Sequence, residues 1–351
     1  MTDRGFRRLI RVTFVSAYLV VLAGSVVRMT GSGMGCPDWP QCFGLMIPPT
    51  DVAEVTWAAG ESYDAGRMLV ANDTLWVASE ALVATDFEAE RAAGQWTPYT
   101  QHDYATFNPV HTWVEFINRL IGAFTGIPAL LLFAAAVVRG FRGRGWRPAG
   151  LAAGTLFMLG FVAWLGKKVV DGNLIPGSIT WHMLGAIAIL LLLAGMLALK
   201  EVRPWGSELD RQIGLSTLFR GRLKAWGGVL FTIAIGQLLF GTQVREAVDL
   251  LAHQGLARAE WMPALPAWWK GHGMAAWLVL LVHLPAIVRL RGCWWGRVVG
   301  AAIAGQFISG LLLHKFGMWP GAQPLHLILA FAVVLADGFL WMSAFRLKSV
   351  E

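Results

Sequence analysis

Long apolar runs alternate with short polar segments along most of the chain. Eight runs of near twenty apolar residues begin close to Leu9, Val114, Pro148, Ile179, Leu223, Gly271, Gly296 and Gln323. A helix needs about 20 residues to cross the ~30 Å hydrocarbon core of a bilayer, so the pattern predicts eight transmembrane helices. The first run is longer than a signal-peptide core and no Ala-x-Ala-type site follows it, which favours a helix of the mature chain.

The composition supports an all-α integral membrane protein. Hydrophobic residues make up 56% of the 351 residues and charged residues 15%, which is too apolar for an ordinary soluble domain. The formal net charge is +7, and a positive net charge could indicate binding to nucleic acid. The basic residues lie at alternate ends of the predicted helices, where membrane topology requires them, so nucleic-acid binding is excluded.

The distribution of charge predicts the orientation of the helices. Lys and Arg gather before the first helix, in every second connection and at the C-terminus, and positive residues are retained on the cytoplasmic side. Both termini are therefore expected to be cytoplasmic. Residues 31–107 carry eleven acids against Arg67 and Arg91, so this segment is expected on the outer side. This segment could form short helices or a lid over the outer end of the bundle, and the sequence does not decide between them.

The two halves of the chain resemble each other in sequence. The first and fifth runs end in LVVLAGSVVRMTGSG and IGQLLFGTQVREAVD. The fourth and eighth runs open with SITWHMLGA and AQPLHLILA, which places His182 and His326 at matching depth. The second and sixth open with EFINRLIGAF and WKGHGMAAWL, which pairs Asn118 with His272. The agreement in order predicts a duplicated bundle of two four-helix halves.

Three histidines lie in the first turns of predicted helices on the outer side: His182, His272 and His326. Facing imidazoles in a helical bundle can hold a haem, and the C-terminal half supplies two of them. The alternative for each is an interfacial histidine bonded to a carbonyl or to water, but pairing across the repeat favours ligation. His283 and His314 are expected to pack or to form hydrogen bonds. Because no Cys-x-x-Cys-His run exists, covalent c-type attachment of haem is excluded.

Glu115 and Asn118 share one face of the second predicted helix, since they stand at positions i and i+3. A carboxylate at the outer end of this helix can accept protons while a carbon is oxidised. The alternative is a salt bridge between Glu115 and Arg119. Arg28, Arg119 and Arg245 near the outer ends can pair with haem propionates or snorkel to the interface.

The stretch GSGMGCPDWPQCFG after the first run holds two of the three cysteines. Cys36 and Cys42 are separated by five residues that include two prolines, a spacing that fits neither a zinc Cys-x-x-Cys pair nor a thioredoxin motif. On the outer, oxidising side they can close a small loop as a disulfide. A structural and a redox role both remain open for it. Cys293 is expected to be a free thiol.

Four motifs together resemble the haem A synthase family of cytochrome oxidase assembly: TGSGMGCPDWPQCFG, EFINRLIGA, GTQVREAVD and AQPLHLILA. The resemblance implies an oxidoreductase of the cytoplasmic (inner) membrane that oxidises the C8 methyl group of haem O to a formyl group. It implies that the C-terminal half, residues 200–351, binds haem b as cofactor. The N-terminal half, residues 1–199 with the outer loop 31–107, would bind haem O. Haem O synthase and an electron acceptor are the implied partners.

The resemblance also implies roles for individual residues. His272 and His326 match the axial ligands of haem b, and His182 matches one histidine of the N-terminal pair. Glu115 matches the essential glutamate of a Glu-x-x-His motif, and Cys36 and Cys42 match the outer cysteine pair. One position departs from the pattern, because Asn118 stands where many members have the histidine. An amide is a poor ligand for haem iron, so we expect the substrate haem to be held through His182 alone.

Two other classes of function stay open. Histidine pairs in a bundle also serve two-haem b-type electron-transfer proteins of the quinol oxidoreductase kind. The duplication is shared with transporters, although both halves enter from the inside and no central charged pathway is evident. The sequence leaves the electron acceptor, the source of the oxygen atom and the oligomeric state open.

Overall fold

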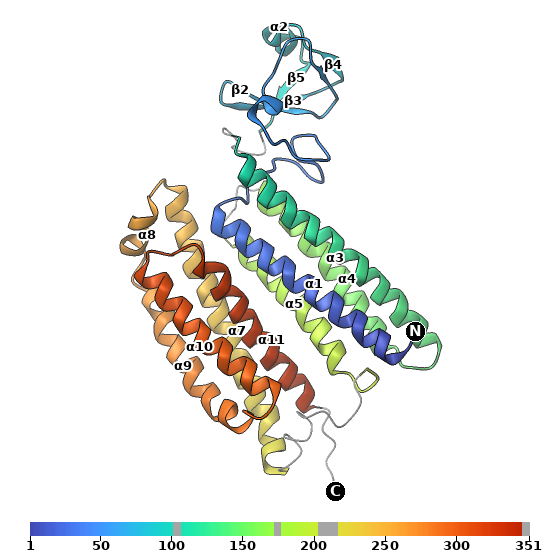
Figure 1. Ribbon diagram of the computed structural model, residues 1–351, viewed down its shortest axis with the longest axis vertical. Coiled ribbons are helices and arrows are strands. Elements are labelled where there is room, and N and C mark those ends of the chain that lie inside the picture. The colour runs from blue at the N-terminus through green and yellow to red at the C-terminus, as the bar shows by residue number, and fades with distance from the viewer. Residues whose placement is uncertain (101–106, 172–176, 203–216, 346–351) are drawn as a thin grey trace. The chain divides into compact units, whose positions relative to one another are not determined.

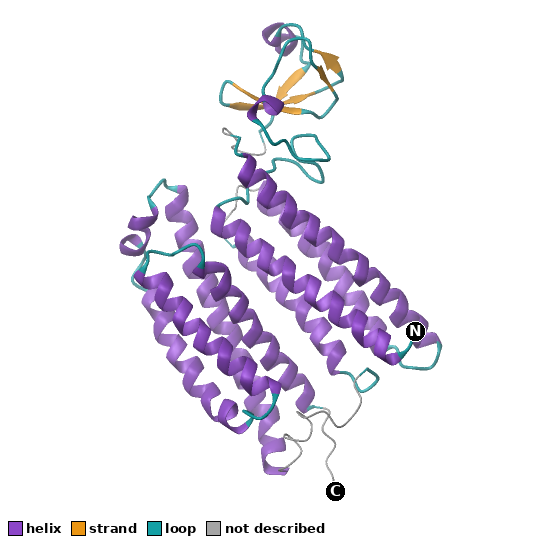
Figure 2. Cartoon of the chain, in the orientation of Figure 1, coloured by secondary structure: helices purple, strands orange, loops and turns teal. Residues whose placement is uncertain are grey.

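The computed structural model describes residues 1–100, 107–171, 177–202 and 217–345 (Figure 1). Eight helices in this part of the chain are long and apolar enough to cross a membrane, and Figure 2 shows that helices dominate it. They are α1 (Asp3–Thr30), α3 (Pro109–Phe141), α4 (Arg147–Asp171), α5 (Ser178–Ala198), α7 (Thr217–His253), α9 (Trp269–Arg289), α10 (Trp294–Lys315) and α11 (Ala322–Ala344). The prediction of an all-α integral membrane protein with eight spans is confirmed.

The chain divides into two compact units. The first consists of Met1–Leu22, Phe124–Val162 and Thr180–Glu351, and the second of Ala23–Ala123 and Ala163–Ile179. The division into two homologous halves at residue 199 and the cytoplasmic position of both termini stay predictions.

In the first unit, α7, α9, α10 and α11 pack side by side as a four-helix bundle. Small residues bring the helices close together: a Cβ on Gly305 of α10 would lie only 2.7 Å from Cδ1 of Leu329 on α11. The indole N–H of Trp295 donates a hydrogen bond of 2.9 Å to the carbonyl of Ala336, which fixes α10 against α11. Such close approach of backbones is the usual basis of helix packing in a membrane.

A separate apolar cluster lies at the end of this bundle where α7 ends and α11 begins. The short helix α8 (Arg258–Ala264) contributes Trp261 to it, next to Val244, Val248 and Met318. These side chains are buried, so they cover the bundle at the level where α9 and α11 begin.

In the second unit, the outer segment folds into a small β module, which the sequence reading did not foresee. Its strands are β1 (Ser62–Tyr63), β2 (Met68–Ala71), β3 (Thr74–Ala78), β4 (Leu82–Val83) and β5 (Trp96–Pro98). They form two antiparallel sheets, β1-β4 and β2-β3-β5. Asn72 and Asp73 join β2 to β3 with φ of 50° and 54°, and two left-handed residues are what a type I′ hairpin requires.

Glu90 organises the core of this module. The residue belongs to α2 (Phe87–Ala92) and is 5% exposed. Its carboxylate accepts hydrogen bonds from the indoles of Trp96 (3.0 Å) and Trp57 (3.1 Å) and from the backbone N–H of Thr85 (2.5 Å). Burial opposes ionisation, but these donors outweigh it and hold the pKa of Glu90 below its usual value.

Glu90→Gln is expected to destabilise the β module by about 1–3 kcal/mol at neutral pH, because an amide accepts these hydrogen bonds less well than a carboxylate. Since the folded-state pKa is lowered, the stabilisation is present above the usual pKa and disappears as pH falls through the folded value. Limited proteolysis across acidic to neutral pH measures it. The control is Glu88→Gln on the same helix, where an exposed carboxylate forms an ion pair with Arg91. Equal resistance of the Glu90→Gln protein and wild type at neutral pH would contradict the assignment.

Candidate functional site

His272 on α9 and His326 on α11 face each other in the C-terminal bundle. Their ring centres lie 6.2 Å apart and their planes are inclined at 71°. An imidazole nitrogen binds a first-row metal at about 2.0 Å, so with the ring centre ~1 Å behind the nitrogen, two rings on opposite sides of one metal have centres ~6 Å apart. The separation in this chain therefore fits two axial ligands of one iron.

The hydrogen bonds of His326 select the tautomer that an iron ligand needs. The Ser309 hydroxyl donates to the Gly305 carbonyl at 2.7 Å and lies 2.8 Å from Nδ1 of His326. A hydroxyl has one hydrogen, so when it donates to the Gly305 carbonyl, the donor to the Ser309 oxygen is Nδ1–H. Nε2 is then unprotonated and able to bind a metal, which is the usual arrangement of ligating histidines.

Two glutamines fix the backbone beside the two histidines. Nε2 of Gln237 on α7 donates to the carbonyl of His272 at 2.9 Å, and Nε2 of Gln306 on α10 donates to the carbonyl of His326. Each histidine is thus attached to a different neighbouring helix. Sequence reasoning missed both glutamines and Ser309. The available signal was a polar residue within an apolar span, in the sequences IGQLLF and AGQFIS.

Glycines on the neighbouring helices let both histidine rings pack closely against the backbone. A Cβ on Gly241 would lie 3.0 Å from Cε1 of His272, and one on Gly310 would lie 3.4 Å from Cε1 of His326. Nδ1 of His272 is buried and has no hydrogen-bond partner in the described part of the chain. Phe240 packs edge-on against the His272 ring, with centres 5.7 Å apart. These residues fit a haem with two axial histidines.

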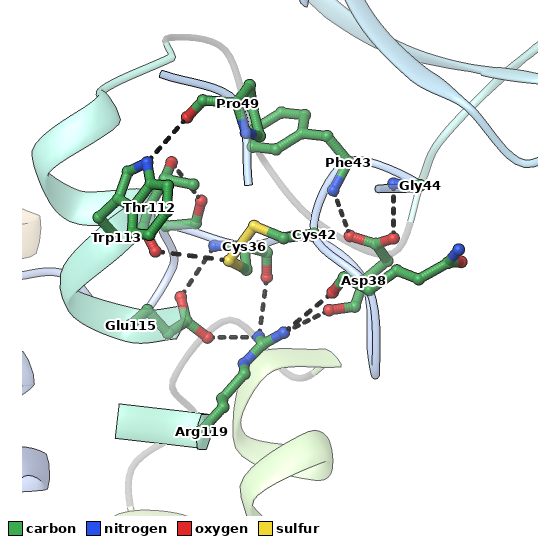
Figure 3. The surroundings of a disulfide bond; sticks show 12 residues. Cys36, Asp38, Cys42, Phe43, Gly44, Pro49, Thr112, Trp113, Glu115 and Arg119 are labelled. Carbon is green, nitrogen blue, oxygen red and sulfur yellow. Dashed lines mark hydrogen bonds and ion pairs between the residues drawn. A yellow bond between two sulfur atoms is a disulfide. The ribbon is translucent and has the colours of Figure 1, made fainter. Parts of the chain in front are cut away.

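A second cluster of functional candidates lies in the second unit, around the disulfide (Figure 3). Cys36 and Cys42 are joined, with their Cα atoms 5.0 Å apart, which confirms the predicted pair. Both are fully buried. Cys293 is a buried free thiol, as predicted.

Glu115 ties the disulfide loop to α3. One carboxylate oxygen accepts a hydrogen bond of 2.8 Å from the backbone N–H of Cys36, and the other forms an ion pair with Arg119. Arg119 also donates to the carbonyls of Cys36, at 3.0 Å, and of Asp38. The salt bridge considered as the alternative for Glu115 therefore exists, and the carboxylate is 4% exposed.

The loop approaches α3 so closely that only glycine fits at one position. A Cβ on Gly35 would lie 2.4 Å from the carbonyl oxygen of His111. The Thr112 hydroxyl donates to the Gly35 carbonyl at 2.8 Å. These contacts could not be predicted from the sequence, because they join segments more than seventy residues apart.

Asp38 binds the backbone at the other end of the disulfide loop. Its carboxylate accepts hydrogen bonds from the backbone N–H groups of Phe43 (2.6 Å) and Gly44 (2.8 Å). Burial raises the pKa of Asp38, although these donors and the Arg119 charge oppose the shift. The loop is therefore held by a carboxylate at each end, Glu115 at Cys36 and Asp38 at Gly44.

Asn118 lies about one helical turn after Glu115 on α3 and is half-buried. Its side-chain oxygen is buried and accepts no hydrogen bond from any described residue. A Cβ on Gly24 of α1 would lie 3.8 Å from this oxygen. The amide oxygen is thus available to a ligand or to water.

His182 lies on α5 and is half-buried. It belongs to the first unit, whereas Glu115 and Asn118 belong to the second, so a substrate site shared by these three residues stays a prediction. Arg245, a candidate partner of haem propionates, ion-pairs with Asp249 at 2.6 Å and donates to Gln323 at 2.8 Å. Its contact with a propionate also stays a prediction.

Comparison with known proteins shows one family that matches most of the chain. The family COX15-CtaA, described as "Cytochrome oxidase assembly protein", matches residues 7–67 and 72–349. A protein named "Heme A synthase" from Shewanella oneidensis is 25% identical over 259 residues, 73% of this chain and 62% of the relative. Two proteins of the same name come from strains of Cereibacter sphaeroides. One is 23% identical over 295 residues, which cover 76% of this chain and 65% of the relative. The other is 24% identical over 332 residues, which cover 89% of this chain and 73% of the relative. The chain thus covers less than two thirds of the length of the first two relatives.

Proposed function

Because this chain belongs to the COX15-CtaA family of cytochrome oxidase assembly proteins, we propose that it is a haem A synthase. It oxidises the C8 methyl group of haem O to a formyl group in the cell inner membrane. The observation that carries the proposal is the pair His272 and His326, spaced for one iron, with Ser309 setting the tautomer of His326. Three relatives named "Heme A synthase" support it.

The C-terminal bundle provides the redox cofactor in this proposal. His272 and His326 would hold haem b. When bound there, haem b supplies one-electron transfer. Ser309 keeps the proton of His326 on Nδ1, while Gln237 and Gln306 hold the backbone of the two histidines in place.

Glu115 handles protons in the N-terminal half. Oxidation of a methyl to a formyl group, with water as the oxygen source, releases four protons and four electrons, so a proton acceptor near the methyl group is required. Arg119 and the Cys36 N–H orient the Glu115 carboxylate. The substrate haem is bound by His182, and the open amide oxygen of Asn118 accepts a hydrogen bond from substrate or water.

The partners of the proposed reaction are haem O, a haem O synthase that delivers it, and an electron acceptor. A two-haem electron-transfer protein is the rival. Extraction of pigments from the purified protein separates the two functions. We expect haem B together with haem O or haem A, and haem B alone after expression with a haem O source would favour the electron carrier.

Asn118→His is expected to convert the substrate-loaded N-terminal haem toward a six-coordinate, low-spin form. The substituted imidazole supplies the second strong axial ligand that an amide does not. Optical and electron paramagnetic resonance spectra of the loaded protein measure the change. Asn118→Ala serves as the control and should weaken substrate positioning without producing low-spin haem. Two bis-histidine haems in the unsubstituted, loaded protein would contradict the assignment.

A further inference from the structure

A fully buried pair of ionisable groups lies within the C-terminal bundle, away from the candidate haem ligands. His283 on α9 and Asp337 on α11 are both 0% exposed, and Nε2 of the histidine lies 2.8 Å from Oδ2 of the aspartate. Ionisable groups in a membrane interior are costly and are usually kept for a function. The proposed function gives this pair no role.

The hydrogen bonds of the pair determine how many protons it holds. Nδ1 of His283 lies 2.7 Å from the carbonyl of Val279, which only accepts, so Nδ1 carries a hydrogen. A second hydrogen must lie between Nε2 and Oδ2. The pair therefore has no net charge, whether it is imidazolium with carboxylate or imidazole with carboxylic acid.

The pair has room for one more proton. Oδ1 of Asp337 is buried and accepts no hydrogen bond from the residues that the structure describes. A proton on Oδ1 gives an imidazolium beside a carboxylic acid and keeps the Nε2–H···Oδ2 hydrogen bond. Its cost is one uncompensated positive charge inside the membrane.

The position of the pair indicates what can compensate that charge. His283 is eleven residues beyond His272 on α9, and Asp337 is eleven residues beyond His326 on α11. Eleven residues make close to three helical turns, so each member lies on the same helix face as a candidate haem ligand, about 16 Å further along the axis. A cofactor held by the two histidines would therefore lie on the same helix faces as the pair, and an electron on it could compensate the charge.

The helices around the pair present mainly apolar groups at this level. A Cβ on Gly338, the neighbour of Asp337, would meet Phe231 of α7 and Leu191 of α5, and Trp295 of α10 binds the carbonyl of Ala336. Two other titratable groups of the packed helices, Cys293 and Tyr18 on α1, are bonded to the carbonyls of Leu290 and Ile328. The basic side chains of these helices toward the same end are exposed: Lys224, Arg289, Arg291 and Arg297.

We propose that His283 and Asp337 form a proton-binding site that takes up one proton when the haem held by His272 and His326 is reduced. The proposal rests on haem binding in the proposed function. One electron from an external one-electron donor adds one negative charge to the haem. One proton from water enters at Oδ1 of Asp337, and oxidation returns both. Compensation of charge in a low-dielectric interior favours the joint transfer.

The test is a redox titration of the purified haem-loaded protein with mediators at a series of pH values. The midpoint potential of the wild type is expected to fall as pH rises, because reduction takes up a proton. In Asp337→Asn, which keeps a hydrogen-bonding group of the same shape, the potential is expected to lose this pH dependence. His283→Gln should behave likewise. Ser343→Ala, which removes another buried polar group of α11, is the matched control and should titrate like the wild type.

Three results would overturn the proposal: a wild-type potential independent of pH, an unchanged slope in Asp337→Asn, or loss of haem from both variants while Ser343→Ala retains it. The last result would assign the pair a structural role. Failure of the proposed function would give a different result: the wild-type protein would bind haem but make no haem A. This titration could still be carried out on that protein.

Discussion

Replacement of His272 or His326 by Ala is expected to abolish the six-coordinate, low-spin haem b spectrum of the purified protein. The two rings are spaced for one iron. Loss of either imidazole removes one of two axial bonds and leaves a five-coordinate or empty site. Optical and electron paramagnetic resonance spectra, with haem content per polypeptide, measure the effect.

Two further variants calibrate this result. Ser309→Ala removes the acceptor of Nδ1–H on His326, and loss of such a partner typically costs about 10–100-fold in metal affinity. We therefore expect weaker haem retention with a normal low-spin spectrum. His314→Ala, at the exposed end of α10 beside Trp269, should change neither. An unchanged low-spin haem in both His272→Ala and His326→Ala would disprove the ligand assignment.

Glu115→Gln is expected to slow haem A formation by about 10²–10⁴-fold, the range for loss of a general acid or base. Glutamine has the same shape and can still accept the hydrogen bond from the Cys36 N–H, so haem b content and the disulfide should be retained. The rate of haem A formation per bound haem b is the measurement.

A control separates proton transfer from attachment of the loop. Thr112→Val removes the hydrogen bond to the Gly35 carbonyl and loosens the same loop, but it leaves the carboxylate in place. It should therefore cost far less activity than Glu115→Gln. A normal rate in Glu115→Gln would show that Glu115 only holds the loop through Cys36 and Arg119.

The sequence predicted the membrane architecture because the length of an apolar run reports directly on its ability to span a bilayer. Pairing across the apparent repeat likewise drew attention to His272 and His326. The β module was missed because its strands are two to five residues long, too short for a clear alternation, and its Asn72-Asp73 hairpin lacks the glycine that usually marks such turns.

The contacts that support the site could not be predicted from the sequence for a different reason. Gln237, Gln306 and Ser309 act on residues of other helices, and the Glu115 carboxylate binds a backbone N–H 79 positions earlier in the chain. Such partners depend on how the helices and the disulfide loop pack, which the order of residues in one segment does not reveal. His283 was expected to pack or to hydrogen-bond, and its bond to Asp337 could not be derived from helix periodicity alone.

Haem analysis after expression with a haem O source tests the central claim most directly. Membranes that contain the protein and haem O should accumulate haem A, whereas membranes with the Glu115→Gln protein at equal haem b content should retain haem O. Haem O that stays unconverted in the presence of wild-type, haem b-loaded protein and an electron acceptor would contradict the proposed function.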